Sequence, residues 1–122
     1  MQQVPHLSIC QSWTESPKII FQLTSTKNII YVIECKKCKE QYVGEGNRTL
    51  QHRFSEHMGY VRNKHLTKVT GEHFNLRGHN QSDMLITIVE KIYNNSDQFR
   101  KQREKMFISK FNTKYKGMNK KT

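Results

Sequence analysis

The segment NIIYVIECKKCKEQYVGEG, residues 28–46, constrains the fold more than any other part of the chain. Its β-branched and aromatic residues predict two short strands, Ile29–Glu34 and Gln41–Gly44, joined by a tight connection that contains Cys35 and Cys38. A hairpin needs no thiols for its geometry, because Asn and Gly alone can form a two-residue turn. The two cysteines therefore indicate that this hairpin also binds something.

The composition supports a bound metal ion. The chain has 122 residues, which suits one domain, and a hydrophobic content of 34%, which makes only a small core. Small domains of this kind are often stabilised by disulfides or by a metal. The three cysteines, two of them close together, argue against a secreted disulfide framework, and the N-terminus lacks a signal-peptide pattern. We therefore expect a reducing, intracellular environment.

Cys35 and Cys38 form half of a predicted zinc site. Two thiolates at this spacing on a hairpin can occupy adjacent corners of a tetrahedron. The segment GEHFNLRGH supplies two further ligands, His73 and His79, with five residues between them. The alternative is two reduced thiols in a turn with histidines on the surface. The competing histidines are His6, His52, His57 and His65. We predict a structural Zn²⁺ ion bound by the two cysteines together with His73 and His79.

The rest of the chain predicts further helices and one more strand. Apolar residues at helical spacing predict a helix over Thr49–Val61. A short helix around Glu72–Leu76, a strand over Met84–Ile92 and a last helix over residues 96–111, capped at its start, follow. An additional edge strand could begin at Ile19–Phe21, and YKGMNKKT, residues 115–122, is expected to be a tail. The predicted fold is a small α+β domain, in which a three-stranded antiparallel sheet is flanked by helices.

The charge is unevenly distributed along the chain. Residues 1–18 show no period, and residues 1–26 are expected to be a linker or tail, so the domain is predicted to span residues 27–122. Residues 1–47 hold five Lys and Arg against four Asp and Glu, whereas residues 48–122 hold 16 against six. Such a basic surface favours a polyanion, and DNA is the expected partner. No apolar run approaches the ~18 residues of a membrane span, so no membrane partner is expected.

Five motifs follow one another along the chain. The first strand begins with IIY and the second contains YVG; the first helix contains LQHRFSEH, the last helix contains REKMFISKFN, and GMN follows. In this order they resemble the GIY-YIG nuclease family, with Ile29 in place of its usual first glycine and Gly44 kept. Each motif alone is weak evidence, but five in order are strong evidence. The residues that the resemblance singles out are Tyr31, Tyr42, Arg53, His57, Glu104 and Asn119.

The resemblance is closest to the endonuclease domain of Penelope-like retroelements. These also carry YVGE, two cysteines between the strand motifs, and later histidines, as in this chain. A reverse transcriptase precedes the nuclease in such elements, so a reverse transcriptase domain is the expected partner in a full-length relative. This chain has no room for one and is expected to be an excised domain, a remnant or a domesticated copy. EGN at 45–47 replaces the usual Thr-Gly pair, and Gly44–Asn47 predicts a turn that tolerates this change.

The resemblance implies a metal-dependent DNA endonuclease that hydrolyses a phosphodiester, with nicking as the expected outcome and the nucleus as the expected location. Glu104 would hold Mg²⁺ or Mn²⁺. The residue lies on a helical stripe with Phe107 and Phe111, so its carboxylate points toward the interior or a cleft and needs a partner. A hard cation with several waters is one such partner, and Arg100 one turn earlier is the other. No small-molecule cofactor is expected.

The resemblance also assigns roles to the remaining residues. Tyr31 or Tyr42 would help to deprotonate the attacking water, with Tyr31 preferred as the base and His57 assisting. A free tyrosine has a pKa of ~10, and nearby cations and a metal are expected to lower it. Arg53 would stabilise the charged phosphate, and Asn119 would position backbone or active-site water.

Other functions fit the same residues less well. Taken singly, the tyrosines could be ordinary strand aromatics, the Arg and His a solvated helix face, and the late Asn a turn residue. The main alternative to a nuclease is a zinc-stabilised DNA-binding module that no longer cuts. A weaker one is a basic RNA-binding protein.

Overall fold

The computed structural model describes residues 25–119, so the edge strand expected at Ile19–Phe21 lies outside the described residues. The strands are β1 Ile29–Cys35, β2 Gln41–Gly46 and β3 Met84–Lys91. The helices are α3 Leu50–Arg62, α4 Val69–His73, the 3₁₀ turn η1 Gln81–Asp83, α5 Asp97–Phe111 and α6 Thr113–Lys116. No helix in this part of the chain is long and apolar enough to cross a membrane.

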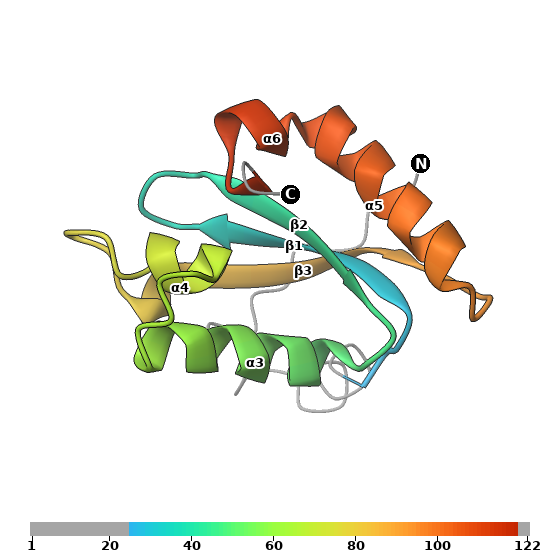
Figure 1. Cartoon of the computed structure of the whole chain (residues 1–122), viewed down its shortest axis with the longest axis horizontal. Helices are drawn as coiled ribbons and strands as arrows, with labels where there is room; N and C mark the ends of the chain where they lie inside the picture. The colour runs from blue at the N-terminus through green and yellow to red at the C-terminus, as the bar shows by residue number, and fades with distance from the viewer. Residues whose placement is uncertain (1–24, 120–122) are drawn as a thin grey trace.

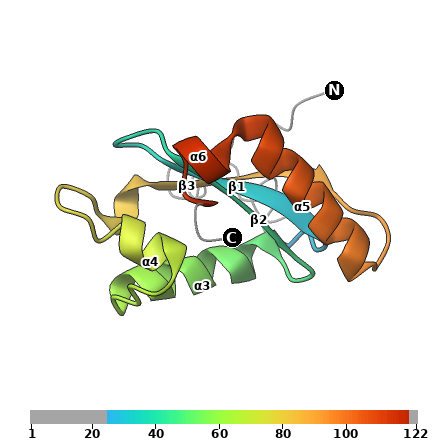
Figure 2. The same cartoon turned by 45° about the horizontal axis from the view of Figure 1, so that its top comes forward.

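The three strands form one antiparallel sheet in the order β2-β1-β3, with helices on both sides (Figure 1). The predicted α+β fold is therefore confirmed. The rotated view shows α3 and α4 on one side of the sheet and α5 on the other (Figure 2). The central strand β1 is covered on both faces, which explains why its sequence is almost continuously β-branched or aromatic.

Alternate residues of β1 divide the interior into two cores. Ile29, Tyr31 and Ile33 belong to the core beneath α3 and α4, and Ile30 and Val32 belong to the core beneath α5. This is the period-two pattern of a strand with two buried faces. Because Tyr31 points to the side of α3, its hydroxyl can reach side chains from that helix.

The long helices begin where their capping residues predict. The hydroxyl of Thr49 accepts a hydrogen bond from the N–H of His52 at 3.0 Å, and Ser96 caps α5 in the same way through Phe99. Three local predictions are wrong. A turn was predicted over Gly44–Asn47, but strand β2 continues to Gly46, because Gly46 still pairs with Ile29.

The other two differences concern the short helices. Helix α4 lies at Val69–His73, earlier than the predicted Glu72–Leu76, because its buried face consists of Thr70, Gly71 and His73 and shows no apolar period. Helix α6 follows Asn112, whose φ of 56° ends α5 and redirects the chain, and it includes the first two residues of the predicted tail.

The packing of Tyr31 on Gly44 determines the geometry of the site. The two residues are partners across β1 and β2, and the tyrosine ring lies over the glycine. A Cβ atom added to Gly44 would collide with Cζ, the hydroxyl and Cε2 of the ring, the last at 2.8 Å. On the other side of β1, the register with β3 shifts between Ile30 and Tyr31, which is a bulge beside the same tyrosine.

We predict that Gly44→Ala destabilises the protein by ~1–3 kcal/mol, as other overpacked core positions do. The Tyr31 ring is fully buried and its hydroxyl is hydrogen-bonded, so it cannot simply move aside. Thermal denaturation followed by circular dichroism measures the change. Gly59→Ala is the matched control, because a Cβ there meets nothing within 4 Å and alanine favours a helix. Equal melting temperatures for Gly44→Ala and the wild type would contradict the prediction.

Candidate active site and metal cluster

The hydroxyl of Tyr31 is the centre of a buried polar network. The tyrosine side chain is 0% exposed. Arg53 donates to the hydroxyl oxygen from Nε at 3.2 Å and from Nη2 at 2.9 Å. Nε2 of His57 lies 2.8 Å from the same oxygen. Because α3 carries both Arg53 and His57 one turn apart, the spacing read from the sequence places both side chains against Tyr31.

The direction of these hydrogen bonds follows from their chemistry. A guanidinium only donates, so the two bonds from Arg53 occupy the lone pairs of the Tyr31 oxygen. The remaining O–H therefore donates to Nε2 of His57. Burial and the neighbouring Arg53 lower the pKa of His57 to about 3, so its ring is neutral and Nε2 can accept this hydrogen bond. The phenol thus has both a stabilising cation and a proton acceptor in place.

Both candidate bases have raised pKa values. Burial raises the pKa of Tyr31, and the neighbouring Tyr42 raises it further, while Arg53 lowers it by less. Burial also raises the pKa of Tyr42, with a contribution from the charge of Glu104. The cation alone therefore does not lower the tyrosine pKa as predicted, because desolvation outweighs it. Tyr42 is half-buried, and its ring lies 5.8 Å from that of His57 between centroids.

Glu104 faces the same site from α5. Its pKa is raised by burial and by the negative charge of Glu45, and its charge also affects Tyr31, Tyr42 and Arg53. Within residues 25–119, the Glu104 carboxylate makes no hydrogen bond or ion pair. A half-buried carboxylate beside a second one is a favourable place for a divalent cation.

Arg100, the other expected partner of Glu104, binds other side chains instead. Its Nε donates to Glu45 at 2.7 Å, and its Nη2 pairs with Asp97 in the first turn of α5. Nη1 donates to Asn28 at 3.3 Å. The buried guanidinium thus links α5 to β2 and makes no ion pair with Glu104, whose nearby positive charges are those of Lys101, Arg53 and Lys105.

Asn119 lies in the interior beside β2. Its Oδ1 accepts from the N–H of Val43 at 2.7 Å, and its Nδ2 donates to the carbonyl of Val43 at 3.0 Å. The Asn119 side chain thus makes the same pair of hydrogen bonds to the Val43 backbone that a neighbouring strand would make. Next to it, the N–H of Met118 donates to the carbonyl of Gln41 at 2.8 Å. These contacts hold the segment after α6 against the strand that carries Tyr42.

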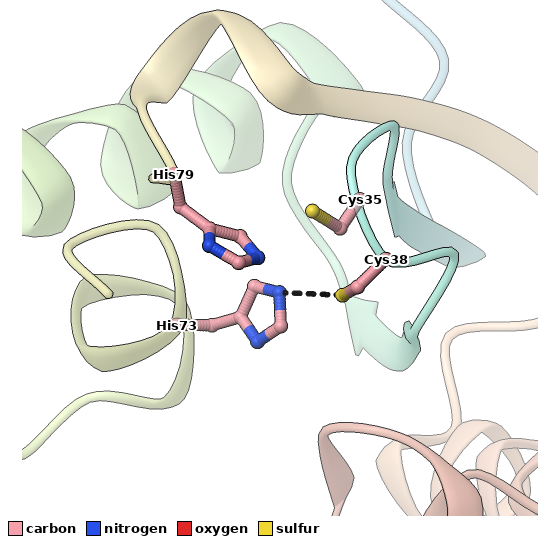
Figure 3. Close-up of side chains that lie close together, drawn as sticks. All are labelled: Cys35, Cys38, His73 and His79. Carbon is pink, nitrogen blue, oxygen red and sulfur yellow. Dashed lines mark hydrogen bonds between the residues drawn. The ribbon is translucent and has the colours of Figure 1, made fainter. Parts of the chain in front are cut away.

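The predicted zinc ligands come together from the β1–β2 hairpin, the end of α4 and the loop that follows α4 (Figure 3). One ligand atom from each of Cys35, Cys38, His73 and His79 lies within 4.8 Å of all the others. The sulfur of Cys38 is 3.4 Å from Nε2 of His73. Tetrahedral zinc with bonds of ~2.0–2.3 Å places its ligand atoms about 3.3–3.8 Å apart. The Cys38–His73 pair is already at that separation, and a pair near the 4.8 Å limit would have to come about 1 Å closer.

The chemistry of the cluster fits zinc. Nε2 of His79 is buried and has no hydrogen-bond partner in the described chain, whereas its Nδ1 lies 3.3 Å from the carbonyl of Arg77. Such an orphaned nitrogen is costly unless it binds something. Burial raises the pKa of the Cys35 thiol, and a bound metal would favour its thiolate. Glu40, 4.0 Å from Nδ1 of His73, is placed to orient that ring.

The fold, with the buried Tyr31 and His57 and the half-buried Arg53, is the one expected of a nuclease catalytic domain. The chain belongs to the GIY-YIG family, because the family model of the GIY-YIG catalytic domain matches residues 27–119. The catalytic domain of homing endonuclease I-TevI is similar in structure, with a TM-score of 0.62 and 22% identity, covering 75% of this chain and 96% of that chain. At this identity the likeness shows the fold. No curated protein matches the chain. Family membership implies metal-dependent endonuclease activity on DNA.

Two side chains that contact the site residues were not predicted from the sequence. Glu56 pairs with Nη1 of Arg53, and the (i, i+3) spacing of the two residues could have indicated this. Thr70 contacts His57 at 2.8 Å, and no local pattern links residues that far apart in sequence.

We predict about one zinc ion per chain, measured by elemental analysis of protein purified without chelator. Cys38→Ser should lower the melting temperature by ~10 °C or more, since each kcal/mol shifts the midpoint of such a domain by ~4–8 °C. His65→Ala, at an exposed histidine outside the cluster, is the matched control. Cys10→Ser should also be harmless; Cys10 lies outside the described residues. Zinc-free protein that melts like the zinc-loaded form would contradict the prediction.

Proposed function

We propose that this chain is a DNA endonuclease of the retroelement type that nicks DNA with Mg²⁺ or Mn²⁺ bound at Glu104. The observation that carries the proposal is the buried Tyr31 hydroxyl, which Arg53 and His57 hold by hydrogen bonds near the Glu104 carboxylate. That carboxylate makes no ion pair within residues 25–119, and its charge helps to raise the Tyr31 pKa. A hard cation bound there would supply charge neutralisation at the phosphate and leaving oxygen. The domain is proposed to span residues 27–122, with residues 1–26 as a tail.

The side chains suggest how the reaction proceeds. An incoming phosphate competes for Arg53, because a guanidinium binds phosphate oxygens in a bidentate manner. When Arg53 turns to the phosphate, the Tyr31 oxygen becomes free to accept a hydrogen bond from the attacking water. Tyr31 then takes the proton of the water as its own proton passes to Nε2 of His57. Tyr42 is the alternative base, since its hydroxyl has no hydrogen-bond partner within residues 25–119.

The retroelement assignment rests on the metal cluster. Cys35 and Cys38 between the strand motifs, with the later His73 and His79, resemble the pattern of Penelope-like endonucleases, and the four side chains lie together. We propose that the ion is Zn²⁺ and stabilises the fold. In a full-length relative, a reverse transcriptase would supply the DNA-primed synthesis that follows a nick. The nucleus is the proposed place of action, because the substrate is DNA.

A basic hollow beside the site offers a place for flanking phosphates. Lys27, Arg48 and His52, with Thr49 and Asn47, line an open depression of about 370 Å³ at the start of α3. The three basic side chains are exposed, so they remain available to a polyanion. Since the first turns of α3 carry both His52 and Arg53, a DNA backbone in this hollow would lead toward the arginine proposed to bind the phosphate.

Glu104→Gln should abolish nicking of supercoiled plasmid in Mg²⁺ or Mn²⁺ while DNA binding persists, because only the metal ligand is lost. Folding raises the pKa of Glu104, so at neutral pH the ionised carboxylate destabilises the folded protein. This destabilisation disappears as the pH falls through the raised pKa. The variant should therefore also melt higher than the wild type in EDTA. Arg53→Ala should slow nicking by ~10²-fold or more.

Glu90→Gln and Arg103→Ala are the matched controls for this experiment, because these two side chains pair with each other at 2.7 Å on β3 and α5. Both controls should nick like the wild type. Wild-type protein that binds plasmid and never nicks it would favour the non-cutting DNA-binding module. Undiminished nicking by Glu104→Gln would place the metal elsewhere.

We predict that DNA affinity falls steeply with salt, with a log–log slope of about −0.9 for each phosphate neutralised. Arg48→Ala should reduce that slope by about one, as expected for the loss of one phosphate contact. Arg62→Ala, at the opposite end of α3, is the matched control for a change of net charge. Fluorescence anisotropy of labelled DNA, titrated at salt concentrations from about 50 to about 300 mM, measures the slope for the wild type and for each variant. Equal slopes for Arg48→Ala and the wild type would show that Arg48 contacts no phosphate and that DNA does not bind in the hollow.

A further inference from the structure

The imidazole of His57 is fixed from both of its nitrogens. Nε2 accepts the Tyr31 hydroxyl proton, so a neutral ring must carry its own proton on Nδ1. Nδ1 lies 2.8 Å from Oγ1 of Thr70, which can accept that proton. The side chains of Thr70 and His57 are 1% and 4% exposed, so water does not replace either partner. A buried N–H without an acceptor costs ~1–3 kcal/mol.

The threonine is held rigidly in place by helix α4. A Cβ atom on the adjacent Gly71 would lie 3.0 Å from the carbonyl oxygen of Tyr60 and would collide with that of His65, so α4 packs directly on the backbone at the end of α3. The side-chain amide of Asn75 donates to the carbonyls of Val61 at 3.0 Å and Gly71 at 2.7 Å. These contacts restrict α4 relative to the helix that carries His57.

We propose that Thr70 is the positioning residue that keeps His57 in the tautomer protonated at Nδ1, and so keeps Nε2 open to the proton of Tyr31. Without the Thr70 hydroxyl, the Nδ1 proton would be buried without an acceptor. The ring would then favour protonation at Nε2, which directs an N–H at Tyr31 and removes its proton acceptor. The effect on catalysis rests on the proposed nuclease function; the choice of tautomer does not.

The test compares Thr70→Val with the wild type by ¹⁵N NMR of the histidine rings, which distinguishes a protonated from an unprotonated ring nitrogen. Wild-type His57 should show Nδ1 protonated and Nε2 unprotonated near neutral pH. Thr70→Val should shift His57 toward protonation at Nε2 and lower the single-turnover nicking rate by about tenfold or more, as loss of other histidine-orienting partners does. Thr70→Ser keeps a hydroxyl and should restore both.

Thr113→Val is the matched control, because Thr113 is equally buried but its hydroxyl makes no hydrogen bond with the described residues. It should leave the His57 signals and the nicking rate unchanged. A wild-type His57 protonated at Nε2, or an unchanged tautomer in Thr70→Val, would overturn the proposal even if the protein cuts DNA. An inactive wild type with the expected NMR shift would instead overturn the proposed function alone. A shifted tautomer with a wild-type nicking rate would overturn the catalytic effect.

Discussion

The hydroxyl of Tyr31 is the group on which the candidate site depends. Three hydrogen bonds join it to Arg53 and His57, and so fix α3 to the central strand of the sheet. Because the network is buried, breaking it leaves polar groups without partners. The ring reaches this place only because Gly44 has no side chain. The glycine of the YVG motif therefore serves the neighbouring strand: it makes room for the aromatic ring whose oxygen organises the site.

Among the described residues, two polar centres suit a cation. Glu104 is half-buried near Glu45, while Arg100 is occupied by Glu45 and Asp97. At the hairpin, two thiols face a histidine nitrogen that has no hydrogen bond. Each centre destabilises the cation-free protein. A bound cation would relieve this destabilisation, and the relief would add to its binding free energy. A domain with a small core can keep both features only if the rest of its packing compensates.

Local patterns predicted those parts of the fold that local forces determine. Burial on both faces selects the β-branched run of β1, and the side chains of Thr49 and Ser96 begin the two long helices. Helix α4 was misplaced because its buried face is built from small and polar side chains. Within the site, the order of motifs indicated which residues belong together, whereas the contact of Thr70 with His57 depends on the path of the loop between them. No sequence period carries that information.

Helix α4 connects the candidate active site to the metal cluster. With only five residues it is far too short to be stable alone, so its position comes from its tertiary contacts. Thr70, Gly71 and Asn75 attach it to α3, while His73 extends from it toward the hairpin cysteines (Figure 3). A metal bound through His73 would restrict the helix by a second, independent contact. An ion bound there would stabilise the hairpin and also limit the motion of the residue proposed to orient His57, so the cluster would contribute to order in the candidate active site as well as to folding.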